Sequence, residues 1–217
     1  MKIIAQIAIT YELIRWEEKT LIETAKEQGL DVRLLHLHTL YIPIGGQTPR
    51  ELYADVVLQR AISHSIALNS TIALESLGLR VVNNSLATAI AMNKLWTLKV
   101  LSQNKIPVPR TLIAFDFEPS VDAAKALGYP VVIKPIDGSW GRLIAMARDN
   151  EELRALIEHR NYIPNPTMKV NMIQEYVRKP DRDLRIFVIG DEVATAIYRV
   201  SNHWITNTAR GGQSHSG

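Results

Sequence analysis

Hydrophobic residues in the first third of the chain form short runs that alternate with longer stretches of mixed apolar and polar positions. Short β-branched runs are typical of buried strands, whereas the longer stretches have the periodicity and length of amphipathic helices. Gly29 and Gly78 follow two of these stretches, and a glycine commonly ends a helix. The pattern predicts strands at residues 3–9, 32–37, 56–59 and 80–83 and helices at residues 13–28 and 66–77. Because strands and helices alternate, we expect a small parallel sheet covered by helices.

The pattern changes in the middle of the chain. Ser85 begins a third helical stretch, residues 85–101, and the prolines of residues 106–109 end it and indicate a hinge or domain boundary. The segments that follow predict a compact α+β unit and then a hairpin that turns at Gly190 and Asp191. The expected strands are 111–114, 130–134, 143–147, 170–176, 184–189 and 192–200, and the expected helices are 120–127 and 150–158. Residues 211–217 have the composition of a flexible loop.

Composition narrows the class of protein. With 47% hydrophobic and 22% charged residues, the 217-residue chain has the composition of an ordinary globular protein, and no apolar run is long enough to span a membrane. The sequence contains no cysteine, which excludes disulfides, thiolate catalysis and cysteine metal sites and favours a cytoplasmic protein. A net charge of +3 and 6% aromatic residues argue against nucleic acid as a partner and favour an acidic protein partner.

The segment with the clearest chemistry is residues 134–142, Lys-Pro-Ile-Asp-Gly-Ser-Trp-Gly-Arg. Lys134 ends a short β-branched run, Pro135 stops the strand, and the two glycines, Gly138 and Gly141, let the backbone approach a ligand closely. A lysine held at a strand end beside exposed N–H donors can neutralise and cover a polyphosphate. The loop lacks the Gly-Lys-Ser/Thr ending of a Walker A motif, and no G-x-G-x-x-G occurs in the chain. A tight turn with a surface lysine is the alternative interpretation.

Two further segments fit the same chemistry. Lys94 lies within the predicted helix at 85–101. The predicted strand segment 173–177, Ile-Gln-Glu-Tyr-Val, ends in polar and aromatic side chains, and an adenine pocket needs an apolar wall with backbone and carboxylate partners. In this order, two lysines, a glycine loop and a Gln-Glu-Tyr-Val strand resemble the ATP-grasp superfamily.

The resemblance becomes more specific when further segments are included. Over essentially its whole length the chain resembles the LysX family of α-aminoadipate–LysW ligases, which is close kin to the RimK glutamate ligases. The segments that carry the resemblance are residues 14–18, 134–142, 174–177, 179–185, 196–199 and 203–212. These motifs are specific in combination and weak one by one.

The resemblance implies an α/β and α+β protein with ATP-grasp architecture. A parallel α/β (pre-ATP-grasp) domain would span residues 1–85, a linker helix and a small central α+β lid domain residues 86–168, and an incomplete antiparallel β domain residues 169–217. Family members bind Mg²⁺ through acidic residues and an asparagine, which we expect beyond residue 217, so the last domain looks truncated.

The resemblance also implies roles for individual residues. The lysines, the glycine loop and the strand-borne polar residues would bind ATP, and residues near the end of the chain would meet the acceptor and the acyl phosphate. The expected nucleotide-binding residues are Lys94, Lys134, Gly138, Ser139, Trp140, Gly141, Gln174, Glu175, Tyr176, Val177 and Asp183, and the expected catalytic residues are Arg185, Arg199, Asn207 and Arg210. The alternatives are solvated lysines, a weak cross-strand ion pair of Asp183 with Arg185, and a polar rim. His36 and His38 share one face of a predicted strand, but no third ligand accompanies them, so we do not expect a metal there.

The activity implied by the resemblance is an ATP-dependent carboxylate–amine ligation in lysine biosynthesis. ATP would phosphorylate the C-terminal glutamate side chain of an acidic, LysW-like amino-group carrier protein, and the α-amino group of α-aminoadipate, or of glutamate, would attack the acyl phosphate. The alternatives are a RimK-like glutamate ligase, a glutamate–carrier ligase of arginine biosynthesis, and a non-catalytic nucleotide-binding module. A homo-oligomer is compatible with the sequence.

A basic segment late in the chain is expected to attract the acidic carrier. Its residues are Arg178, Lys179, Arg182, Arg185, Arg199 and Arg210. Exposed charge of this kind steers an acidic partner and is screened by salt. We expect Arg178 and Lys179 to flank the nucleotide site without touching the nucleotide.

Overall fold

The computed structural model of the protein describes residues 5–207 and 211–216. The chain divides into two compact units, Met1–Met92 and Asn93–Gly217, and each is described by itself. The three-domain division expected from the sequence stays a prediction. No helix in the described part of the chain is long and apolar enough to cross a membrane.

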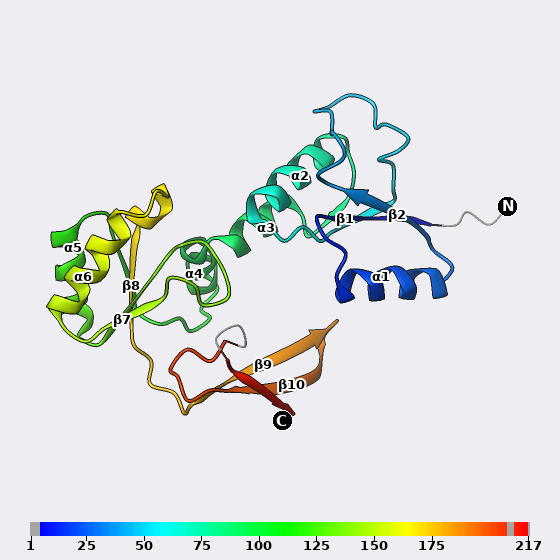
Figure 1. The fold of residues 1–217 in the computed structure, drawn as a ribbon. Coiled ribbons are helices and arrows are strands. Elements are labelled where there is room, and N and C mark those ends of the chain that lie inside the picture. Colours follow the sequence, from blue (N-terminus) through cyan, green and yellow to red (C-terminus); the bar gives the residue numbers. More distant parts are fainter. Residues whose placement is uncertain (1–4, 208–210, 217) are drawn as a thin grey trace. The chain divides into compact units, whose positions relative to one another are not determined.

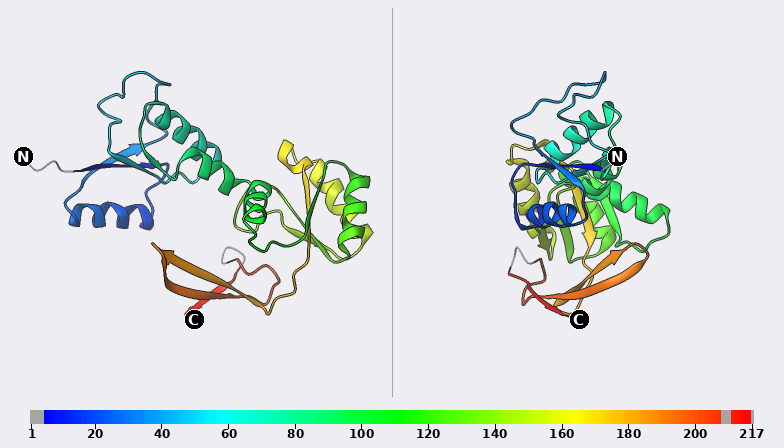
Figure 2. Two further views of the ribbon diagram at one scale, coloured as in Figure 1. Left: turned by 180° about the vertical axis from the view of Figure 1, so that it is seen from behind. Right: turned by 90° about the vertical axis from the view of Figure 1, so that its right-hand side faces the viewer.

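The first unit is built on a four-stranded parallel sheet (Figure 1). Its strands are β1 (Gln6–Tyr11), β2 (Asp31–His36), β3 (Val56–Gln59) and β4 (Val81–Val82), in the order β2-β1-β3-β4. Its helices are α1 (Trp16–Glu27), α2 (His64–Ser76) and α3 (Ser85–Met92). Helix α1 lies on one face of the sheet and α2 on the other, which both Figure 1 and Figure 2 show. The expected parallel α/β arrangement is confirmed.

Strand β1 extends two residues beyond the predicted end at Ile9. Thr10 is fully buried in this extension, and its hydroxyl donates a hydrogen bond of 2.7 Å to the side-chain oxygen of Gln59 on β3. The polar residue is therefore part of the sheet because a neighbouring strand satisfies its hydroxyl. The predicted start at residue 3 lies outside the described residues.

The single helix predicted at 85–101 is wrong, because the chain breaks at Asn93. Helix α3 ends at Met92, and α4 (Lys94–Gln103) begins immediately afterwards. Asn93 has an extended backbone, and its side-chain oxygen caps α4 by accepting a hydrogen bond of 3.0 Å from the N–H of Trp96. Lys94 is thus the first residue of a helix and also the second residue of the second unit.

The second unit contains a four-stranded antiparallel sheet with helices on one face. Its strands are β5 (Thr111–Ala114), β6 (Val131–Lys134), β7 (Ala145–Ala147) and β8 (Asn171–Glu175), in the order β5-β8-β6-β7. Helices α5 (Phe117–Leu127) and α6 (Asn150–Asn161) pack together on this sheet, and a short 3₁₀ helix (Pro166–Lys169) leads into β8. The core between them contains Val121, Val131, Ile133, Leu153 and Ile173. The compact α+β unit predicted here is confirmed.

A second, three-stranded antiparallel sheet completes this unit. Its strands are β9 (Arg182–Ile189), β10 (Glu192–Val200) and β11 (Gln213–Ser216), in the order β11-β10-β9. The predicted hairpin with its turn at Gly190 and Asp191 is confirmed. The flexible loop predicted at 211–217 is wrong for residues 213–216, because β10 offers this polar segment a free edge on which to pair, with Ser214 opposite Arg199.

Candidate active site

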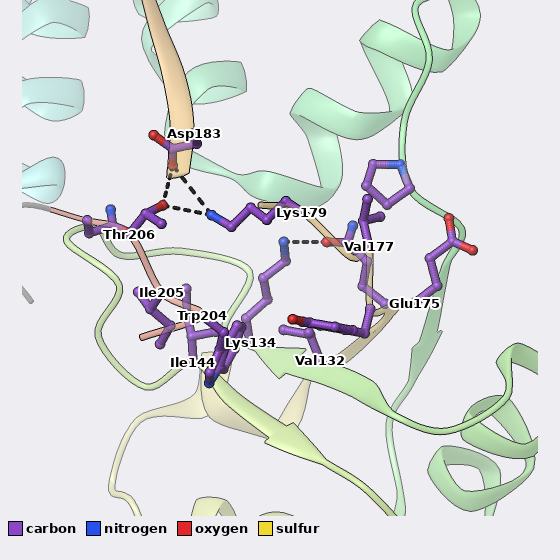
Figure 3. Close-up of a pocket in the computed structure, with 14 residues that line it drawn as sticks. Val132, Lys134, Ile144, Glu175, Val177, Lys179, Asp183, Trp204, Ile205 and Thr206 are labelled. Atoms are coloured by element: carbon purple, nitrogen blue, oxygen red, sulfur yellow. Dashed lines mark hydrogen bonds and ion pairs between the residues drawn. The ribbon is translucent and has the colours of Figure 1, made fainter. Parts of the chain in front are cut away.

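Figure 3 shows a pocket of the second unit. It lies on the face of the β5-β8-β6-β7 sheet opposite α5 and α6. Side chains alternate along β6, so Val131 and Ile133 pack under the helices while Val132 and Lys134 face the pocket. The cavity has a volume of about 210 Å³. It is lined by Pro109, Val132, Lys134, Ile144, Gln174, Glu175, Tyr176, Val177, Lys179, Asp183, Trp204, Ile205, Thr206 and Asn207. An apolar wall, two lysines and two carboxylates therefore meet in one cavity.

Lys134 ends β6 and points into the pocket. Its Nζ donates a hydrogen bond of 2.6 Å to Oε1 of Gln174, and Nε2 of Gln174 donates one of 2.7 Å to Oγ1 of Thr111. Burial lowers the pKa of Lys134, and the positive charge of Lys94 lowers it further. An anion between these lysines would offset both effects, so the arrangement favours a negatively charged ligand.

Lys94 reaches the same region from the first turn of α4. Its Nζ donates a hydrogen bond of 2.7 Å to the carbonyl of Gly138, and its backbone N–H donates one of 2.6 Å to the carbonyl of Ile136. Burial lowers the pKa of Lys94, although the carboxylate of Asp137 acts in the opposite direction. Two lysines that are distant in sequence thus meet at the glycine loop, as the sequence predicts for a phosphate site.

We expect Lys94 and Lys134 to take up protons when a polyphosphate binds between them. Both lysines have a pKa below the ordinary value of 10.5 in the free protein, and an adjacent anion would raise each pKa again. Affinity for the anion should therefore fall as the pH rises through the lowered pKa values. Calorimetric titration with a non-hydrolysable ATP analogue, in buffers of different ionisation enthalpy, measures the uptake. An affinity for the analogue that is independent of pH up to 10.5 would contradict the expected proton uptake.

The glycine loop itself is shaped by residues with left-handed backbone. Trp140 has a φ of 61°, Gly141 of 69° and Leu143 of 56°. Leu143 therefore cannot begin a strand, and β7 starts at Ala145 instead of the predicted residue 143. Trp140 is half exposed, and the guanidinium carbon of Arg142 lies 4.5 Å from the centre of its ring.

None of the four expected nucleotide contacts of this loop is tested by the pocket geometry. Ser139 accepts a hydrogen bond of 3.3 Å at its carbonyl from the N–H of Arg142, which closes the loop. The residues that line the cavity include none of Gly138, Ser139, Trp140 and Gly141, and they do not include Lys94. Their roles in binding a nucleotide stay predictions.

Gly141 is the loop position where a side chain should do most harm. A Cβ there would lie 3.2 Å from Cγ2 of Ile205 and 3.4 Å from Oδ1 of Asn207, on a backbone with a φ of 69°. We expect Gly141→Ala to lower the free energy of unfolding by about 2 kcal/mol and to weaken nucleotide binding, because the loop must move away from Asn207. The matched control is Gly138→Ala, which shares the positive φ but meets no atom within 4 Å, so only the backbone cost of about 1 kcal/mol applies. Equal losses in denaturant unfolding would show that the contact with Ile205 and Asn207 contributes nothing.

The segment from Gln174 to Val177 forms the wall of the pocket at the end of β8. The carboxylate of Glu175 accepts a hydrogen bond of 2.8 Å from the N–H of Arg110, so it is already engaged by the backbone of a neighbouring segment. Tyr176 packs edge-to-face on Trp204, with 6.2 Å between ring centres. Val177 is half exposed at the pocket rim. The four residues come together as predicted, and their contact with a base stays a prediction.

Asp183 lies at the centre of a charged network on the opposite wall (Figure 3). Its carboxylate accepts hydrogen bonds of 2.7 and 2.8 Å from Nε and Nη2 of Arg199 and a further one from the hydroxyl of Thr206. Burial alone would raise the pKa of Asp183, but the bonds from Arg199 and Thr206 outweigh it and lower the pKa. The cross-strand ion pair considered from the sequence therefore exists, but its arginine is Arg199 and not Arg185, which is exposed.

Lys179 lies closer to the expected nucleotide site than the sequence suggested. Its Nζ donates a hydrogen bond of 2.7 Å to Oγ1 of Thr206 and lies 3.7 Å from Oδ2 of Asp183. Lys179 lines the cavity, and the expectation that it does not touch the nucleotide stays a prediction. Lys179, Thr206 and Trp204 were missed as site residues. Only the spacing of Lys179, two residues beyond Val177, could have indicated that it belongs to the same wall.

The expected catalytic residues are only partly brought together. Arg199 and Asn207 lie near Asp183 or line the cavity, whereas the exposed Arg185 does not line it. Arg210 lies outside the described residues. Their catalytic roles stay predictions.

The histidine pair of the first unit makes other contacts. His36 stacks on Tyr11 with 5.0 Å between ring centres, and Nε2 of His38 lies 3.4 Å from the carboxylate of Glu12. Within the described part of the chain, no three metal-ligating side chains come together.

Comparison with known protein families assigns both units. The pattern of the LysX preATP-grasp domain matches residues 7–90, and that of the RimK-like ATP-grasp domain matches residues 91–216. The chain is similar to a solved structure of a RimK domain ATP-grasp protein from Sphaerobacter thermophilus, with a TM-score of 0.75 and 24% identity over 90% of this chain and 73% of that one. At that identity the likeness shows the ATP-grasp fold alone.

Two curated relatives are similar in sequence as well. The α-aminoadipate–LysW ligase LysX of Sulfolobus acidocaldarius is 42% identical over 93% of this chain and 74% of its own length. The glutamate–LysW ligase ArgX of the same organism is 32% identical over 95% of this chain and 73% of its own length. Because the two domain patterns span residues 7–216 and the LysX relative is similar throughout, the chain belongs to the RimK-like ATP-grasp family, in its LysX branch.

Proposed function

We propose that this protein is an ATP-dependent carboxylate–amine ligase of lysine biosynthesis that acts in the cytoplasm. Its substrates are ATP, an acidic LysW-like carrier protein and α-aminoadipate. A γ-phosphoryl group passes to the side-chain carboxylate of the carrier's C-terminal glutamate and releases ADP. The α-amino group of α-aminoadipate then attacks the acyl carbon, an isopeptide bond forms and phosphate leaves.

The observation that carries the proposal is the convergence of Lys94 and Lys134 on the glycine loop beside an apolar cavity. Both ammonium groups have pKa values lowered by burial, so a triphosphate would find preorganised positive charge there. The cavity of about 210 Å³, walled by Val132, Tyr176 and Trp204, suits an adenine ring and part of its ribose. The residues present therefore fit ATP.

Magnesium would neutralise part of the triphosphate charge when it is bound. The described residues hold no cluster suited to it, and the expectation from the sequence about its ligands stays a prediction.

The remaining polar residues of the pocket suit positioning more than proton transfer. Asp183 holds the guanidinium of Arg199 in a fixed, bidentate geometry, and Lys179 and Thr206 brace the same carboxylate. A guanidinium fixed in this way can orient a carboxylate and stabilise charge on a transferring phosphoryl group. An acyl phosphate already reacts with amines, so excluding water and aligning the amine are the main tasks of the protein.

The choice between α-aminoadipate and glutamate as the acceptor rests on similarity to named relatives. Relatives named for α-aminoadipate are 40 to 42% identical to this chain, and those named for glutamate are 31 to 32% identical. One methylene separates the two acceptors, and it is worth only about 1 to 3 kcal/mol of discrimination. The higher identity favours α-aminoadipate.

The test is ligation with the purified full-length protein, a LysW-like carrier, ATP and Mg²⁺, with α-aminoadipate and glutamate in separate reactions. We expect phosphate release that requires both carrier and α-aminoadipate, together with a carrier heavier by one α-aminoadipyl group in mass spectrometry. Modification by glutamate alone would establish the glutamate–carrier alternative. Nucleotide binding without phosphate release in either reaction would favour the non-catalytic module.

Carrier association should depend on exposed positive charge outside the pocket. Arg178 is exposed and does not line the cavity, so Arg178→Glu should weaken carrier association several-fold and leave nucleotide affinity unchanged. The matched control is Lys169→Glu, an equally charged reversal at an exposed residue of the 3₁₀ helix. Surface plasmon resonance at several salt concentrations measures both variants. If Arg178→Glu and Lys169→Glu behave alike, Arg178 belongs to an ordinary solvated surface.

A further inference from the structure

A buried carboxylate in the first unit holds two arginine side chains. The side chain of Glu18, in the first turn of α1, is 1% exposed. It accepts hydrogen bonds of 3.0 and 2.8 Å from Nε and Nη2 of Arg15 and one of 3.0 Å from Nε of Arg60, whose Nη2 lies 2.9 Å from Oε1 of Glu18 in an ion pair. We call these three residues the arginine clamp. Two guanidinium groups and one carboxylate leave it with one net positive charge.

The arginine clamp lies at the carboxyl end of the parallel sheet. Arg60 directly follows β3, and Arg15 follows β1 after a short loop. The backbone N–H of Arg60 donates a hydrogen bond of 3.1 Å to the carbonyl of Thr10 in β1, which ties the two strand ends together. Ligands of open parallel sheets bind at this edge. The clamp thus occupies a ligand-binding position and shares no residue with the nucleotide pocket.

Both guanidinium groups keep donors for a second anion. Arg15 and Arg60 each use Nε and Nη2 on Glu18, and no hydrogen bond among the described residues uses Nη1 of either. Each arginine side chain is 34% exposed, so solutes can approach it. A buried carboxylate that fixes a guanidinium lowers the entropy lost on binding, and the planar fork matches a carboxylate.

Neighbouring carboxylates do not fill the clamp. Glu12 accepts backbone hydrogen bonds of 2.6 and 2.7 Å from Ile62 and Ser63 and is close to His38, so it is engaged elsewhere. Glu17 is held loosely, since its carboxylate lies 3.7 Å from Nε of Arg15 and its side chain is 49% exposed. Glu17 therefore acts as a weak internal competitor for any carboxylate that approaches Arg15.

We propose that the arginine clamp is a second carboxylate-binding site, which takes the carboxylate of a free amino acid or of an acidic peptide end. The guanidinium groups of Arg15 and Arg60, both fixed by the buried carboxylate of Glu18, would bind such a carboxylate in the absence of a nucleotide. The site goes beyond the proposed ligase reaction, because its occupancy requires neither ATP nor turnover.

The test measures the chemical accessibility of Arg15 and Arg60. Phenylglyoxal modifies accessible arginines, and peptide mass mapping of the whole chain gives the rates at Arg15 and Arg60. The probes are α-aminoadipate, glutamate and an acidic peptide that ends in glutamate, with sodium chloride of equal ionic strength as the control. We expect at least one carboxylate probe to slow the modification of Arg60 several-fold while chloride has no effect.

The pattern of protection identifies the source of the carboxylate. Protection by amino acids alone indicates a small-molecule site, and protection by the peptide alone indicates an acidic protein partner. If no carboxylate probe protects Arg60 beyond the chloride control, the proposal is overturned. Because the readout is local and needs no ATP, a failure of the ligase reaction does not affect it.

Two variants separate binding from structure. Glu17→Gln removes the internal competitor, so the protecting probe should act at a several-fold lower concentration. Arg60→Gln removes one fork and should abolish the protection of Arg15. Unchanged protection of Arg15 in folded Arg60→Gln protein would contradict the clamp, and if this variant does not fold, Glu17→Gln and the parent protein decide the question.

Discussion

Lys134→Met should weaken ATP binding roughly 10- to 100-fold while leaving the fold intact. The ammonium group of Lys134 would make charge-assisted hydrogen bonds to phosphate, each worth about 1.5 to 3 kcal/mol. In the free protein the same group only donates to Gln174, and burial lowers its pKa. Losing that bond and relieving a desolvated charge offset each other, so we expect the free energy of unfolding to change by less than about 1 kcal/mol.

Calorimetry with ATP and thermal unfolding with and without ATP together decide this prediction. The matched control is Lys125→Met on α5, an exposed lysine 3.9 Å from Asp122, which should change neither quantity. Parent-like ATP affinity in Lys134→Met would remove the central support for the nucleotide site. A large loss of stability in the absence of ATP would instead mark Lys134 as a structural residue.

Glu18→Gln should lower the free energy of unfolding of the first unit by about 3 kcal/mol. Glu18 is fully buried and binds both Arg15 and Arg60, and removing the charge leaves two guanidinium groups without their counterion. Denaturant unfolding monitored in the first unit measures the loss. The adjacent Glu17→Gln is the control, because its loose and exposed ion pair should contribute less than about 1 kcal/mol.

Acid should remove a large part of the same stabilisation from the parent protein. The hydrogen bonds from Arg15 and Arg60 outweigh burial and lower the pKa of Glu18 from 4.5 to about 2. The stabilisation is therefore complete above pH 4.5 and disappears as the pH falls toward 2. Because solvent near the two arginines screens the charges, we expect ionised Glu18 to contribute about 2 kcal/mol to the free energy of unfolding. A Glu18→Gln protein whose unfolding energy has the same pH profile as the parent in this range would contradict the assignment.

Local sequence signals predicted a large part of the fold and of the site. The run of residues 131–133, with a lysine at its end and glycines after it, places Lys134 at a strand end beside a loop because all of these features are adjacent in the chain. The alternation of strands and helices in residues 5–92 similarly predicts the parallel sheet, since each element buries its own apolar face. The ATP-grasp fold and the LysX resemblance follow from such motifs and are confirmed by the comparisons.

The contacts that complete the pocket depended on pairing between distant segments. Sequence spacing suggested Arg185 as the partner of Asp183, but the register of β9 and β10 places Arg199 directly opposite Asp183. The helix expected through Asn93 breaks because the backbone N–H of Lys94 pairs with Ile136, a residue distant in sequence. Lys179 lines the pocket because its ammonium group donates a hydrogen bond to Thr206 and forms an ion pair with Asp183.

The sequence by itself determined most of the elements and the family, and it predicts a phosphate-binding glycine loop, because hydrophobic periodicity and turn residues act over a few positions. Only the tertiary structure decided which charges meet. Ion-pair partners, the burial of Glu18 between Arg15 and Arg60, and the pairing of β11 with β10 depend on strand register and on distances between remote segments. Local periodicity carries no information about those distances, so the arginine clamp and the Asp183 network became visible only once the chain was folded.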